Sequence, residues 1–384
     1  MRVRQLAILV LCLAMGSAAL ADVVYMKNGR KVEGEIIERT KTVIRIRSKA
    51  GTIRNLRIAD VKKVEVAGGV LPGSKKKKKK DADDPRSADT KRYEEQMGRK
   101  LNVVTKPRVL VRGDHPHDEL QKIADAAEMT VLHFIETFEC DVKTFLKGKD
   151  GYAGRVEVFQ FRKEKAYLKF MDKVYDRLRD RKSVNDERFK MMRRNRGFWV
   201  LDPVPIIGGY MGPSPFEACV SNVSHKTSHV LLELYETRYW KRPWWLYEGL
   251  ATWQEIQITG KSLTYCLEPA GPASYAKDGT PDADELKKAQ TAKLWRAHIR
   301  RKVKAREEKD LKVLGRLSLN ELHRDEVIQS WSVVDWISRK GKLKAFVKEL
   351  KKNDQNLDKA FSTVLGYGVE AAHEKWRAWV LAAR

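Results

Sequence analysis

The residues best suited to chemistry lie in two short segments. His225 and His229 stand in the sequence His-Lys-Thr-Ser-His, and Glu248 follows after a gap of eighteen residues in Trp-Leu-Tyr-Glu-Gly-Leu-Ala. Two histidines four positions apart on a helix project from one face, about one turn from each other. Both imidazoles can therefore reach a single ion, and a carboxylate from a second helix can complete the set. Two His and one Glu, at roughly 2.0–2.2 Å, are a common ligand set for Zn²⁺.

This spacing, with the Glu in that apolar setting, resembles the gluzincin zinc metallopeptidases and, within them, the peptidase MA-like domains. The resemblance implies that His225, His229 and Glu248 hold a zinc ion. In that family a Glu follows the first His, giving His-Glu-x-x-His, and acts as general base for the water that attacks the peptide bond. Lys226 occupies that position in this chain.

Lys226 changes the chemistry that the motif can perform. An ammonium group has no lone pair with which to accept a proton, and general-base assistance contributes about 10²–10⁴ in rate. A neutral Lys226 could act as a base or as a ligand, but the motif offers no evident partner to hold the amine in place. The sequence therefore predicts a retained zinc site without efficient hydrolysis: a pseudopeptidase that binds peptide or envelope protein in its groove.

Two alternatives remain open. In the first, the protein is an active zinc peptidase with a substituted base. Glu255 is a candidate, because it lies seven residues after Glu248 on roughly the same helical face. The same position would also let Glu255 hydrogen-bond a ligand histidine, or be an ordinary paired glutamate. In the second alternative, the protein is a basic envelope protein that binds polyanions.

The formal net charge of +26 motivates that second alternative. So basic a surface attracts nucleic acid, anionic lipid heads or acidic envelope polymers through a salt-sensitive term that does not depend on sequence. Six consecutive lysines, Lys75 to Lys80, are the candidate contact for an anionic polymer. The charge could equally serve solubility alone.

The first residues predict export. Arg2 and Arg4 precede an apolar run from Leu6 to Met15, and small residues follow up to Ala21. This pattern is typical of a secretory signal peptide over residues 1–21, cleaved before Asp22. The remaining chain has no apolar stretch long enough for a transmembrane segment. We therefore expect a periplasmic or secreted protein.

Three cysteines remain after that cleavage: Cys140, Cys219 and Cys266. An odd number allows at most one intramolecular disulfide, and the sequence does not choose the pair. None lies in a Cys-x-x-Cys pattern, which favours small buried residues for at least two of them.

The expected fold class is α+β, in three parts. Residues 22–67 contain five short alternating runs and an Asn28-Gly29 turn, which predicts a small β-barrel that resembles Sm-like barrels. Residues 68–93 predict a lysine-rich linker. Residues 94–384 resemble the peptidase MA-like domain, which implies a mixed sheet, metal-site helices and a helical subdomain from about residue 284.

Two further expectations concern the surroundings of the site. Phe216 to Val223 looks extended, and by the family resemblance Phe216 to Ser221 is the edge strand that pairs with substrate, fed by a turn at residues 208–213. His225 to Tyr235 and Pro243 to Ile258 are the expected metal-site helices.

Overall fold

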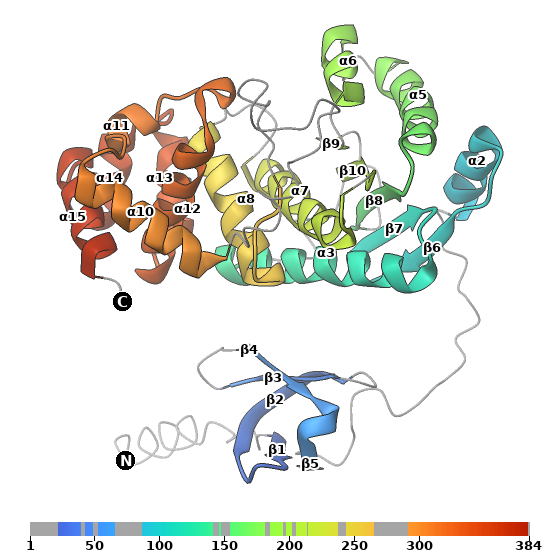
Figure 1. Cartoon of the computed structure of the whole chain (residues 1–384), viewed down its shortest axis with the longest axis horizontal. Coiled ribbons are helices and arrows are strands. Elements are labelled where there is room, and N and C mark those ends of the chain that lie inside the picture. The colour runs from blue at the N-terminus through green and yellow to red at the C-terminus, as the bar shows by residue number, and fades with distance from the viewer. Residues whose placement is uncertain are drawn as a thin grey trace, which may run out of the picture. The chain divides into compact units, whose positions relative to one another are not determined.

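The computed structural model describes residues 22–39, 43–48, 53–65, 87–140, 146, 154–180, 185–194, 197–201, 205–212, 214–236, 243–264 and 291–382. The chain divides into two compact units, Met1–Pro85 and Arg86–Arg384 (Figure 1). The predicted signal peptide and Lys75 to Lys80 lie outside the described residues. The end of the predicted linker is helical instead, because α2 spans Ser87–Met97.

The first unit is an antiparallel sheet with strand order β4-β3-β2-β1-β5. Alternating residues such as Val24, Ile44 and Ile46 are buried on its inner face. The five predicted strands are confirmed, but the closed barrel is not found: in the described part of this unit, β4 and β5 are the outer strands and do not pair. The strands are β1 Asp22–Met26, β2 Lys31–Arg39, β3 Val43–Arg47, β4 Ile53–Arg57 and β5 Val61–Glu65.

The second unit contains a mixed sheet with strand order β6-β7-β8-β10-β9. The three inner strands β7, β8 and β10 are parallel, whereas β6 and β9 pair antiparallel at the two edges. The strands are β6 Asn102–Thr105, β7 Val109–Gly113, β8 Val156–Phe161, β9 Gly197–Leu201 and β10 Pro205–Tyr210.

Both faces of this sheet are covered, as expected for parallel strands. Helices α3 (His117–Phe138) and α7 (Phe216–Glu236) pack on one face, where Val158 and Ile207 enter the main core. Helix α5 (Glu164–Asp180) packs on the other face, where Phe159, Phe161 and Phe198 form a separate core. A short helix, α6 (Asp186–Arg194), follows α5.

The predicted edge strand at Phe216 to Val223 is wrong, because these residues form the first two turns of α7. Phe216, Cys219 and Val223 recur at intervals of three and four, which is the period of a helix. The outer strand beside this helix is β9. Residues 208–210, expected in a turn, belong to β10.

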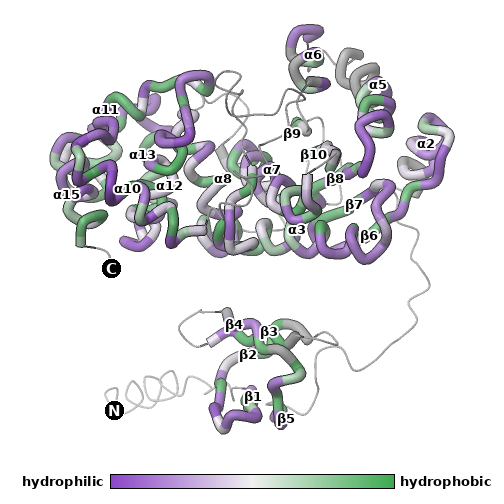
Figure 2. Tube along the Cα trace, viewed as in Figure 1, coloured by the Kyte–Doolittle hydropathy of each residue, from purple (hydrophilic) through white to green (hydrophobic). Residues whose placement is uncertain are grey.

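Helix α8 (Trp244–Thr259) lies against α3, α7 and α12, and most of its side chains are buried. The predicted C-terminal helical region is present from residue 292 onward, and its outer helices carry both hydrophilic and hydrophobic residues (Figure 2). Its helices are α10 Ala292–Ala305, α11 Leu311–Leu314, α12 Arg324–Arg339, α13 Leu343–Lys352, α14 Leu357–Leu365 and α15 Val369–Ala382.

Cys219 is a buried free cysteine, Cys140 is half-buried, and Cys266 lies outside the described residues. Within the described ranges, no helix has the length and apolar character needed to cross a membrane.

Candidate metal centre

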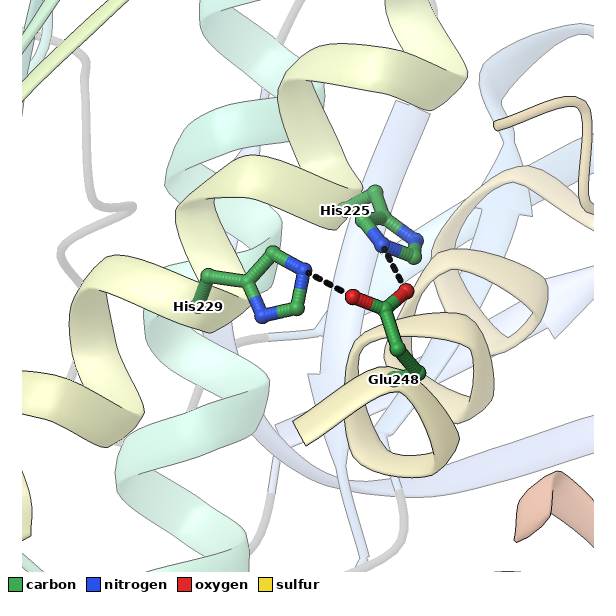
Figure 3. Close-up of side chains that lie close together, drawn as sticks. All are labelled: His225, His229 and Glu248. Atoms are coloured by element: carbon green, nitrogen blue, oxygen red, sulfur yellow. Dashed lines mark ion pairs between the residues drawn. The ribbon is translucent and has the colours of Figure 1, made fainter. Parts of the chain in front are cut away.

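The structure brings together the three predicted metal ligands. His225 and His229 project from α7 and Glu248 projects from α8, and all three are buried. Figure 3 shows the Glu248 carboxylate between the two imidazole rings. His225 Nε2 lies 3.3 Å from Glu248 Oε2, and His229 Nε2 lies 3.4 Å from Glu248 Oε1. The candidate ligand atoms all lie within 4.8 Å of one another.

Close helix packing places Glu248 at this point. The next residue, Gly249, faces α12, where an added Cβ would lie 2.8 Å from the backbone of Ser330. Only a residue without a side chain fits there, because real Cβ atoms do not approach backbone so closely. Gly249 therefore lets α8 pack against α12, while Glu248 and its neighbours pack against α7.

Glu255 holds the first histidine. Its Oε2 lies 3.0 Å from His225 Nδ1, and its carboxylate is fully buried. The same carboxylate accepts hydrogen bonds from Ser262 Oγ, Leu263 N and Thr264 N at 2.9, 2.8 and 3.2 Å. With Glu255 as acceptor, Nδ1 of His225 carries the proton and Nε2 is left to face Glu248.

That tautomer is the one a metal ligand needs. A neutral His225 presents the Nε2 lone pair to a carboxylate oxygen, and these two acceptors face each other unless a proton or a cation lies between them. Metal-binding histidines commonly donate the other ring N–H to a carboxylate in this way.

The charge of Glu248 reflects the same arrangement. Burial alone would raise the pKa of Glu248. With both histidines protonated and no ion between the side chains, the charge of His229 and hydrogen bonds from His225 and His229 outweigh burial and lower the pKa from 4.5 to about 2. Glu248 is therefore an anion at neutral pH, and it lies where a cation would be stabilised.

Aromatic rings flank His229. The ring of Trp199, on β9, lies nearly parallel to the imidazole, with 5.5 Å between centroids and 24° between planes. The ring of Tyr247 is also nearly parallel, at 6.2 Å and 20°. His225 meets His229 edge-on, with centroids 4.8 Å apart. The plane of the His229 imidazole is thus defined by its neighbours.

Lys226 is buried and extends toward β9. Its Nζ lies over Gly197, in the space that a Cβ at that position would need, and such a Cβ would also lie 2.7 Å from the carbonyl oxygen of Gly208. Gly197 therefore makes room for the lysine. The ammonium group rests against the edge of the sheet.

Two imidazoles and one carboxylate are a donor set that suits a divalent cation. The two nitrogen-to-oxygen contacts, at 3.3 and 3.4 Å, involve different oxygens of Glu248, and the candidate ligand atoms all lie within 4.8 Å of one another. The group His225, His229 and Glu248 could hold a metal ion.

Glu255 lies on the other side of His225 from these ligand atoms. It contacts Nδ1, whereas Nε2 faces Glu248. Of the two roles left open for Glu255, this geometry favours support of the ligand histidine over service as a base.

Sequence reasoning did not find Gly197, Trp199 or the donors at residues 262–264. Their places depend on the packing of β9 and of the segment after α8 around the site, which no local spacing encodes. Tyr247 was the one neighbour with a local signal, since it directly precedes Glu248.

Comparison with protein-family models found no match for this chain, and comparison with curated proteins found none either. The likeness to gluzincins therefore rests on the motif itself.

Proposed function

We propose that this protein is an exported, gluzincin-type metallopeptidase-like protein that binds zinc and has lost efficient peptidase activity. The observation that carries the proposal is the buried group of His225, His229 and Glu248, supported by Glu255 on His225 Nδ1. In this proposal it is a pseudopeptidase that binds peptide or envelope protein.

Zinc, when bound, would supply Lewis-acid polarisation of a carbonyl oxygen. The protein's own residues would do the rest. His225, His229 and Glu248 would hold the ion, and Glu255 would keep the proton of His225 on Nδ1, away from the ion. The two helices α7 and α8 would thereby be joined through one centre.

The proposed loss of activity rests on Lys226. The residue at this place in active members of the family must accept a proton, and a protonated amine cannot do so. The side chain extends toward Gly197 of β9. Glu255 lies on the opposite edge of His225, so nothing in its placement favours it as a substitute.

The edge strand β9 would be the docking edge for a bound peptide. In the described part of the sheet it is the outer strand, paired on one side to β10. An exposed strand edge can add an extended peptide through main-chain hydrogen bonds. This assigns to β9 the role that the sequence suggested for Phe216 to Ser221.

The test compares wild type, Lys226→Gln and Lys226→Glu, and adds His229→Ala to wild type and to Lys226→Glu. Each form of the chain from Asp22 onward is supplied with zinc and an unstructured protein substrate. Wild type and Lys226→Gln are expected to show no chelator-sensitive cleavage. Lys226→Glu is expected to gain cleavage, which a further His229→Ala substitution abolishes. Cleavage by wild type that His229→Ala removes would refute the pseudopeptidase proposal and favour an active peptidase.

A further inference from the structure

Two residues of strand β9 lie opposite two residues of helix α7. Gly197 and Trp199 are two residues apart on the strand, so both point to the same face of the sheet. That face is the one covered by α7, because Trp199 packs with the main core on the α7 side. Gly197 lies under Lys226, and Trp199 stacks on His229, one helical turn further along.

The two ligand histidines are held by different means. His225 is oriented through a hydrogen bond between Nδ1 and the buried Glu255. His229 is oriented by ring stacking, with Trp199 on β9 and Tyr247 on α8. Tyr247 belongs to the same helix as Glu248, whereas Trp199 belongs to the outer strand of the sheet. A shift of β9 would therefore move the Trp199 ring that holds the plane of the His229 imidazole.

We infer that Trp199 is a positioning residue for the metal centre, which holds the His229 imidazole in the plane that lets Nε2 reach the ion. The inference rests on the proposed function, since it assumes that the ion binds. Trp199 is only partly buried, although the ligand that it covers is 1% exposed. A chain bound along β9 would thus lie next to a residue that orients His229.

The size of the expected effect follows from ring stacking. Stacked aromatic pairs contribute a modest free energy beyond the area that they bury, equivalent to about a threefold to tenfold change in an equilibrium constant. Removal of the Trp199 ring should therefore weaken metal binding about threefold to tenfold. The effect should be smaller than loss of a hydrogen-bonded support, which is typically worth about 10- to 100-fold.

The test measures Co²⁺ and Zn²⁺ affinity of the chain from Asp22 onward by competition with a chromophoric chelator, together with the visible absorption of the Co²⁺ form. The variants are Trp199→Leu, which removes the ring, and Trp199→Phe, which keeps an aromatic face. Trp379→Leu is the control, because Trp379 is another partly buried tryptophan of the same core, on α15. Thermal unfolding of each metal-free variant shows whether it is folded.

Trp199→Leu is expected to lose affinity about threefold to tenfold and to alter the Co²⁺ absorption band, whereas Trp199→Phe and Trp379→Leu stay close to wild type. If Trp199→Leu is unfolded, Trp199→Met takes its place, since it also removes the ring but has a more adaptable side chain. Equal affinity and an unchanged Co²⁺ band in folded Trp199→Leu would overturn the inference. A wild type that binds neither ion would instead overturn the proposed function.

Discussion

Glu255 holds His225, one of the three candidate metal ligands, through the Nδ1 atom of the ring. Its carboxylate is fully buried and joins His225 to three donors after α8. Removing one partner of such a buried network leaves the other polar groups unsatisfied. The segment at residues 262–264 and the metal ligand therefore share one anchor.

Glu255→Gln should weaken zinc binding by about 10- to 100-fold, because the neutral amide is a poorer acceptor for the His225 N–H. Chelator competition measures the loss. The matched control is Glu217→Gln, which changes an exposed carboxylate on the same helix as the histidines. An affinity equal to that of wild type would show that Glu255 does not support the ligand.

His133 is expected to make the free energy of unfolding depend on pH. It lies on α3 with its ring 4.9 Å from the ring of Trp253, and burial lowers its pKa from 6.5 to about 4. Between these values the unfolded chain binds more protons than the folded chain. The free energy of unfolding therefore falls as the pH decreases from about 6.5 toward 4, by up to about 3 kcal/mol from this residue.

Urea unfolding of wild type and His133→Leu across that range checks the prediction. Other groups titrate in both proteins, so the quantity of interest is the difference between their two pH profiles. Wild type should lose more stability toward low pH than His133→Leu does. Parallel profiles would mean that His133 titrates normally.

Most of the individual site residues could be predicted from the sequence. The two histidines follow from a spacing of four within one helix, Glu248 from its gap and apolar setting in the motif, and Glu255 from its spacing of seven after Glu248. The structure brings these residues together. Trp199 could not be found in this way, since its contact with His229 depends on how β9 packs against α7. A stacking contact between distant segments leaves no period in the sequence.

At the scale of elements, β9 and α7 pack closely at Gly197. A Cβ atom at Gly197 would clash with the Nζ atom of Lys226 on α7. It would also lie too close to the carbonyl oxygen of Gly208 on β10. The far end of a lysine can move aside, but the backbone of β10 cannot do so without disturbing the sheet.

Gly197→Ala should therefore destabilise the protein by about 1–3 kcal/mol, the usual cost of overpacking. In a Lys226→Ala background the same substitution should cost less, because one of the two clashes is gone. Denaturant unfolding of the four proteins in this cycle measures the difference. An identical cost in both backgrounds would show that Lys226 yields without strain.

Element types were predictable where one period dominated. The five strands of the first unit and the helices α3 and α8 followed from alternation and from helical spacing. Phe216 to Val223 looks extended in the sequence, and the family resemblance implies an edge strand there, whereas the spacing of Phe216, Cys219 and Val223 fits a helix. The closure of the first unit was not predictable, since it depends on pairing between β4 and β5 rather than on either strand alone.

At the scale of the whole molecule, the dominant property is charge. With a formal net charge of +26, the protein should bind heparin or DNA at low salt and release it as salt rises. Replacing Lys75 to Lys80 by glutamine should reduce the steepness of this salt dependence, because fewer counterions are displaced. Binding titrations at several salt concentrations measure it. An unchanged slope would place the contact elsewhere on the chain.

The central claim is that His225, His229 and Glu248 form a zinc site. The most direct test is the zinc content and zinc affinity of the purified chain from Asp22 onward, measured beside His229→Ala and Glu248→Ala. The account predicts about one zinc per wild-type chain, removable by a chelator and lost from both variants while they stay folded. A folded wild-type protein that binds no zinc, or that binds it equally well without His229, would contradict the account.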